Sequence, residues 1–168
     1  RISMLFFLCS FTYFWLLDKA YFNNHYYFMS LMCFLLFWVD RNSSFKKNNY
    51  VNRFSLFAIQ VMVLIIYLIA GINKLNPYWL IDLQPISFIL ENKCDVTGDT
   101  FFINPLLITL IAYGGLLFDL CIGFLLFCNR TKLFAFTLVF LFNIINYFLF
   151  LDNSEIGVFP FIMISTLI

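Results

Sequence analysis

Long apolar runs separated by short polar segments dominate the pattern along this chain. Six runs are apolar enough to form membrane helices: residues 4–17, 25–39, 54–75, 104–127, 133–151 and 158–168. A helix needs about 20 apolar residues to cross the hydrocarbon core, where its backbone must satisfy its own hydrogen bonds. The alternation typical of β-barrel strands is absent from the sequence. The pattern therefore predicts an all-α membrane protein, a polytopic helical bundle with about six spans.

The two ends of the sequence interrupt this pattern. The chain begins with Arg1 and enters an apolar run at once, and it stops at Ile168 inside another run. We therefore expect the first and last spans to be truncated. Residues 1–168 are interpreted as a fragment of one transmembrane domain, with flanking helices and any lumenal domain outside it.

Composition supports a membrane environment and argues against several kinds of partner. Hydrophobic residues make up 63% of the 168 residues and charged residues only 11%, whereas a soluble domain carries roughly a quarter charged residues. A net charge of +1 gives no reason to expect a nucleic-acid partner. The five cysteines contain no C-x-x-C pair, so we expect packing residues and no metal. They are Cys9, Cys33, Cys94, Cys121 and Cys128.

The basic residues of the loops predict an orientation. Segments 40–53 and 128–132 are rich in Lys and Arg, and the alternating segments 18–24, 76–103 and 152–157 are not. Basic loops remain on the cytoplasmic side. The other three segments are therefore predicted to face the periplasm of a bacterial inner membrane or the lumen of the endoplasmic reticulum.

Segment 76–103 is too long for a simple connection between two helices. Its first part, residues 77–85, is amphipathic and aromatic, which predicts a short helix lying in the membrane interface. Its second part, residues 91–100, is polar and is expected to form a surface loop.

A few polar side chains interrupt the apolar runs, and such residues are functional candidates. Lys74 ends the third run, three residues after Gly71, and His25 begins the second. With the predicted orientation, both lie at the non-cytoplasmic end. Lys74 has two interpretations: an anchor whose ammonium reaches the headgroups, or a desolvated amine that accepts a proton. Gly71 would leave room beside it for a close helix or a flat ligand.

Asp119 lies within the fourth run, about fifteen residues from its non-cytoplasmic start. At a rise of ~1.5 Å per residue it is predicted to lie roughly 20 Å below Lys74 in depth. We therefore expect a structural hydrogen bond to a neighbouring helix, and no pairing with Lys74.

Three sequence strings contain these polar residues. The first is Asn23-Asn24-His25-Tyr26-Tyr27. The second has Tyr67, Ala70, Gly71, Lys74, Leu75 and Trp79 in the spacing Y-x-x-A-G-x-x-K-L-x-x-x-W. The third is Gly114-Gly115-Leu116-Leu117-Phe118-Asp119-Leu120. Together they resemble the vitamin K-dependent γ-glutamyl carboxylases, whose membrane part is the HTTM (horizontally transferred transmembrane) domain. Order and approximate spacing agree with that family over nearly the whole chain.

The resemblance implies a carboxylase of peptidyl glutamate. In that reaction the residue at position 74 deprotonates reduced vitamin K and the one at position 25 assists. Oxygenation of the quinone to its epoxide then drives removal of a γ-proton from a glutamate-containing protein substrate, and the carbanion captures CO2. Lys74 and His25 are thus the candidate catalytic residues. The candidate quinone contacts are Asn24, Tyr67, Gly71, Trp79 and Asn146.

Three departures from the family pattern keep alternatives open. Asn143 stands where the family often has His, Asn73 precedes Lys74 where animal enzymes carry a second Lys, and segment 150–155 is longer than usual. The alternatives are a family member that binds a quinone or lipid but has different chemistry, and a non-catalytic helical membrane subunit.

Overall fold

A computed structural model describes residues 2–17, 24–38, 53–150 and 159–165 of the chain. The described residues are helices joined by turns, with no strand among them, which confirms the predicted all-α class. They form two compact units, residues 1–62 and 63–168.

The first unit contains α1 (Ile2–Leu16) and α2 (Asn24–Trp38), two apolar helices that pack against each other. Ser30 of α2 links them, because its hydroxyl oxygen accepts hydrogen bonds from Thr12 and from the indole of Trp15, both at 3.0 Å. The indole of Trp15 is thereby satisfied inside an otherwise apolar contact.

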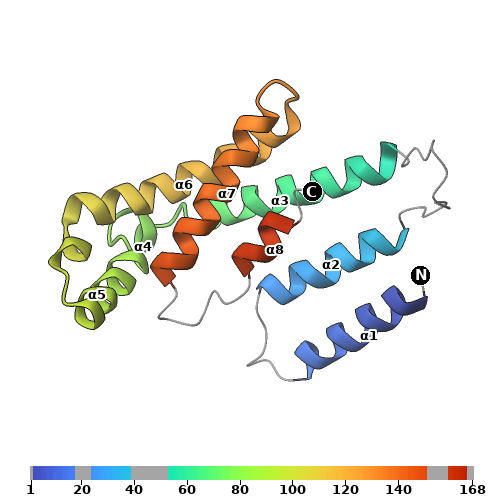
Figure 1. Ribbon diagram of the computed structural model, residues 1–168, viewed down its shortest axis with the longest axis horizontal. Coiled ribbons are helices and arrows are strands. Elements are labelled where there is room, and N and C mark those ends of the chain that lie inside the picture. Colours follow the sequence, from blue (N-terminus) through green and yellow to red (C-terminus); the bar gives the residue numbers. More distant parts are fainter. Residues whose placement is uncertain (1, 18–23, 39–52, 151–158, 166–168) are drawn as a thin grey trace. The chain divides into compact units, whose positions relative to one another are not determined.

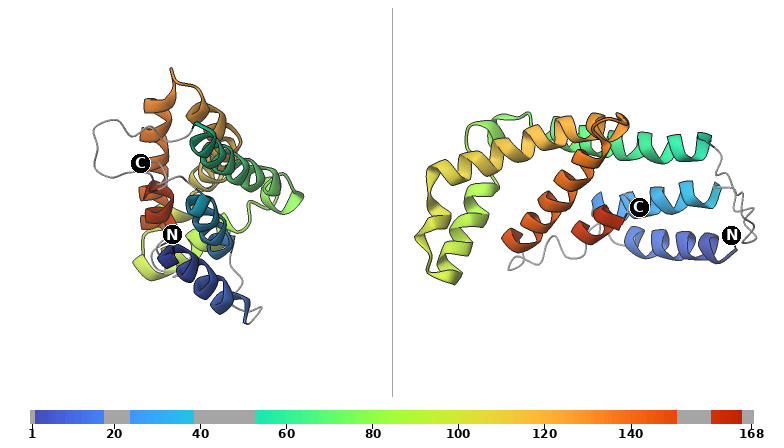
Figure 2. Two further views of the ribbon diagram at one scale, coloured as in Figure 1. Left: turned by 90° about the vertical axis from the view of Figure 1, so that its right-hand side faces the viewer. Right: turned by 45° about the horizontal axis from the view of Figure 1, so that its top comes forward.

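The second unit begins within α3 (Arg53–Asn73). The elements that follow are α4 (Pro77–Leu80), α5 (Ile86–Thr97), the 3₁₀ helix η2 (Thr100–Ile103), α6 (Pro105–Phe127), α7 (Lys132–Phe150) and α8 (Phe159–Ser165) (Figures 1 and 2). Among the described residues, α3, α6 and α7 are long and apolar enough to cross a membrane, and α1 and α2 are shorter apolar helices. The predicted boundaries of these helices agree with the structure to within about two residues.

Local sequence explains where the helices of the second unit begin and end. Asn76 caps α4 by accepting a hydrogen bond from the backbone of Trp79, and Asn104 caps α6 in the same way through Leu106. Proline follows each cap, at a position where its missing N–H costs nothing. Gly98 ends α5 with a left-handed backbone (φ 72°), a conformation that glycine adopts without strain.

Helix α6 is the central element of the second unit, and α3 packs closely against its second half. A Cβ atom at Gly71 would lie 2.7 Å from the side chain of Leu120, and one at Gly123 would lie 2.5 Å from the side chain of Leu64. The two helices therefore approach through glycines, as small residues allow in membrane bundles.

On another side of α6, helix α7 packs through aromatic rings. The rings of Phe118 and Phe142 stack with their centroids 3.8 Å apart, and Tyr147 contacts Phe161 of α8. A second helix thus restrains the middle of α6.

The first half of α6 is covered by the segment that follows α3. Ile86 and Leu90 of α5 form a buried cluster with Ile108 and Ala112 of α6. Lys93 of α5 donates hydrogen bonds to the backbone carbonyls of Phe148 and Leu149, at the end of α7. The predicted surface loop at residues 91–100 is therefore wrong: most of it is the second half of a helix. The predicted interfacial helix at 77–85 is shortened to α4, which packs on α6.

Candidate functional site

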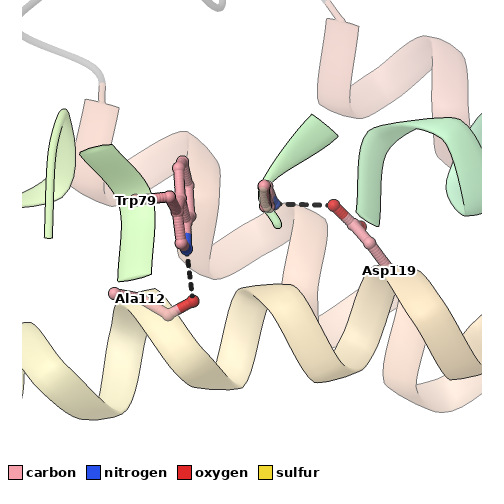
Figure 3. Close-up of polar contacts among 4 residues, drawn as sticks. Trp79, Ala112 and Asp119 are labelled. Atoms are coloured by element: carbon pink, nitrogen blue, oxygen red, sulfur yellow. Dashed lines mark hydrogen bonds and ion pairs between the residues drawn. The ribbon is translucent and has the colours of Figure 1, made fainter. Parts of the chain in front are cut away.

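An ion pair between Lys74 and Asp119 is the centre of the candidate site. The ammonium Nζ of Lys74 lies 2.6 Å from Oδ2 of Asp119, and the side chains are only 21% and 7% exposed. Lys74 follows directly on α3, and Asp119 projects from α6 (Figure 3). A charge-assisted hydrogen bond of this length, away from water, is among the stronger polar contacts of a protein.

The structure overturns the expectation that these two residues lie far apart in depth. Asp119 is near the middle of α6, about 21 Å along the axis from Pro105 at ~1.5 Å per residue. The expectation assumed that α3 ends level with the start of α6. It does not, because α4 and α5 occupy the first half of α6 and α3 reaches only the second half.

The aromatic ring of Trp79 packs beside the ammonium of Lys74. Its indole nitrogen donates a hydrogen bond to the carbonyl oxygen of Ala112 at 3.1 Å, which fixes the ring against α6 (Figure 3). The centroid of that ring lies 4.7 Å from Nζ of Lys74, within cation–π range. The side chain predicted as a quinone contact is thus beside Lys74, held by the short helix α4.

Two glycines near Lys74 have different surroundings. Gly71 is packed directly against Leu120, so the predicted alternative of a close helix is the one that the structure shows. A flat ligand has no room at that position. Gly115 of α6 faces the amine instead, and a Cβ there would lie 3.7 Å from Nζ. The amine therefore lies over bare backbone of α6.

Tyr67, one helical turn before Gly71 on α3, has a buried hydroxyl with no hydrogen bond. The residue is 5% exposed and its ring meets Phe118 edge-on at 5.8 Å. Its hydroxyl lies beside the amide of Asn143 and within the field of Asp119, but it does not reach hydrogen-bond geometry with either. Buried hydroxyls are usually paired, so this one is available to a water molecule or a ligand oxygen.

Asn143 of α7 was not among the residues predicted at the site, yet it lies beside Tyr67. Its amide nitrogen donates to the carbonyl of Val139 at 2.8 Å, and its side chain is buried. Asn146, the residue expected at the quinone, is half-buried one turn further along the same helix. The burial of Asn143 had a signal in the sequence, because Ala135, Val139 and Asn143 recur every four residues and therefore share one face of α7, which is buried.

His25 and Asn24 are the first residues of α2, in the other unit of the chain. Their proximity to Lys74 stays a prediction.

Among the residues that the structure describes, no group of three His, Cys, Asp or Glu side chains is arranged to hold a metal ion.

The model of the HTTM domain matches residues 1–168. The chain belongs to the HTTM family. This confirms the resemblance found in the sequence, and it agrees with the long apolar helices in making the chain an integral membrane protein. The HTTM domain is associated with the membrane part of vitamin K-dependent carboxylases. No solved structure matches the chain.

Proposed function

We propose that this HTTM chain is the membrane part of a quinone-dependent carboxylase that converts peptidyl glutamate to γ-carboxyglutamate. Lys74 is the residue that accepts a proton. One observation carries the proposal: the amine of Lys74 is held against a carboxylate midway along an apolar helix. A lysine that merely anchors a helix at the headgroups needs no buried carboxylate as a partner, because water and headgroups solvate its ammonium.

The side chains around Lys74 fit a flat, apolar ring that carries oxygen atoms. The ring of Trp79 and the stacked rings of Phe118 and Phe142 are aromatic surfaces within the same cluster of helices. The unpaired hydroxyl of Tyr67 can donate to an oxygen, and Gly115 leaves space beside Nζ. Tyr67, Trp79 and Gly115 are the residues that would hold a reduced quinone.

When bound, a reduced quinone such as vitamin K hydroquinone would supply an acidic hydroxyl and, with O2, the strong base that carboxylation by CO2 requires. The residues of this chain contribute proton transfer, positioning and the exclusion of water. Lys74 takes up a proton at Nζ, Trp79 restrains the amine, and the apolar helices exclude the water that would quench a strong base. His25, Asn24 and Asn146 belong to the proposal through the family resemblance.

The test is a carboxylation assay on the full-length protein in lipid nanodiscs with reduced vitamin K, O2, labelled CO2 and a glutamate-containing peptide. We expect label to enter the peptide and the quinone epoxide to form, both only with the reduced quinone. Neither product in a folded, quinone-binding preparation would contradict the proposal and favour a family member with different chemistry. A preparation that binds no quinone would favour a non-catalytic subunit.

A further inference from the structure

The pairing of Lys74 with the carboxylate of Asp119 limits how Lys74 can act as a base. The cation of an ion pair such as Lys74–Asp119 is an ammonium, which has no lone pair. Nζ therefore accepts a proton only after giving one away. Oδ2 of Asp119 lies 2.6 Å from Nζ, within the distance at which a proton passes directly between two atoms.

Residues of α3, of α7 and of the short helix α4 surround the ion pair between Lys74 and Asp119 of α6. Lys74, directly after α3, and Tyr67 of α3 are the titratable residues placed near the carboxylate. On α7, Phe142 stacks on Phe118, the residue before Asp119, and Asn143 lies beside Tyr67. Helix α4 contributes Trp79, whose ring lies 4.7 Å from the amine. The carboxylate itself is 7% exposed.

Burial reduces the difference in free energy between the charged form of the pair (ammonium and carboxylate) and its neutral form (amine and carboxylic acid). In water an ammonium and a carboxylate are both strongly solvated, and a proton does not return to the carboxylate. Removing both groups from water costs each charge several kcal/mol of solvation, a cost that the two neutral partners do not carry. Burial therefore makes transfer of the proton from Nζ to Oδ2 accessible.

We propose that Asp119 is the positioning residue that stores the proton of Lys74 while Lys74 deprotonates its ligand. This inference rests on the proposed function. One N–H bond of Lys74 breaks and an O–H bond forms on Oδ2 of Asp119. The lone pair left on Nζ then bonds to the proton of the ligand hydroxyl, whose electron pair stays on the ligand oxygen.

The pair changes from neutral to a single positive charge in this step, and no oxidant or reductant is needed. The positive charge remains on Nζ, beside the oxygen that lost its proton. A fixed cation in a dry site stabilises such an oxygen far more than it would in water. Asp119 thus lets one lysine act first as a base and then as the counter-charge.

The test uses infrared difference spectroscopy on the full-length protein in nanodiscs, with reduced vitamin K added as the probe. We expect a new carbonyl band of a protonated carboxyl group that shifts when the aspartates carry ¹³C. The band should persist in Asp95→Asn, which changes an exposed carboxylate on α5, and disappear in Asp119→Asn. The isotope shift in the unchanged protein requires no variant to fold.

Epoxide formation is measured in the same samples. We expect Asp119→Asn to lower its rate at least about 100-fold, the lower end for loss of acid–base help, and Asp119→Glu to restore part of it. Lys74-dependent epoxide formation without the band, or at a full rate in Asp119→Asn, overturns this inference and leaves the proposed function standing. If Lys74→Arg retains full activity, or the unchanged protein forms no epoxide, the proposed function fails and the inference with it.

Discussion

Lys74 and Asp119 are 45 residues apart in the sequence, and their side chains join the end of α3 to the middle of α6. The contact places two charged groups within the apolar part of the bundle, where each needs the other. Both the proposed chemistry and a large part of the local stability depend on this pair.

Removing one member of the pair should destabilise the protein more than removing both. Asp119→Leu leaves the ammonium of Lys74 partly buried without its carboxylate, a change that costs up to roughly 3–5 kcal/mol in buried pairs. The double change Lys74→Met with Asp119→Leu removes both charges and should recover most of that loss. Thermal unfolding in detergent measures the difference. A single variant as stable as the double would show that the pair does not hold the helices.

The hydroxyl of Tyr67 should add nothing to stability. It is buried and makes no hydrogen bond, so Tyr67→Phe removes a polar group without removing a partner. We expect an unchanged or higher unfolding temperature. The matched control is Tyr113→Phe, because the hydroxyl of Tyr113 donates to the carbonyl of Leu80 at 2.7 Å and its loss should cost about 1 kcal/mol. Equal destabilisation by both variants would mean that Tyr67 has a partner.

Close packing of α3 on α6 should make Gly123 intolerant of even a methyl group. A Cβ at that position would lie 3.1 Å from the backbone of Leu64 as well as 2.5 Å from its side chain, so the helices must move apart. Overpacking of this kind costs roughly 1–3 kcal/mol. Gly114→Ala is the control, since nothing lies within 4 Å of a Cβ there. Unfolding measurements that rank the two variants equally would contradict the close approach of the helices.

Two cysteines test the predicted orientation. An impermeant thiol reagent should label Cys94 of α5 in intact cells, and Cys128 only after permeabilisation. Cys128 is exposed, and hydrogen bonds from the backbone N–H groups of Arg130 and Thr131 and from the Thr131 hydroxyl lower its thiol pKa. A lower pKa means more thiolate at neutral pH, so Cys128 should react faster there than an ordinary thiol. Labelling of Cys128 alone in intact cells would reverse the orientation.

The helices could be predicted from the sequence because apolar length and the polar breaks between runs suffice to locate membrane spans. The boundaries of α3 and α6 follow from their composition and from the Asn-Pro pairs that begin α4 and α6. The family could also be recognised, since spaced motifs around His25, Lys74 and Asp119 are visible without coordinates.

The pairing of Lys74 with Asp119 could not be predicted by counting residues along each span. Such counting gives the depth of a residue in the membrane only if neighbouring spans begin and end at the same depth. The stagger arises from α5, whose charged residues around Lys93 suggested a loop. Its apolar positions Ile86 and Leu90 are four residues apart and were the available signal for a helix packed on α6. Asn143 was missed because the family motif, and not the four-residue spacing that Asn143 shares with Ala135 and Val139, guided the choice between the asparagines of α7.

Epoxide formation by Lys74→Arg in the full-length protein tests the central claim most directly. Arginine keeps a cation beside Asp119 but does not give up its proton, so it cannot act as a base. We predict that Lys74→Arg accumulates in the membrane and forms epoxide at least about 100-fold more slowly. Lys132→Arg, at the start of α7, should keep normal turnover. Normal turnover in Lys74→Arg would contradict the account.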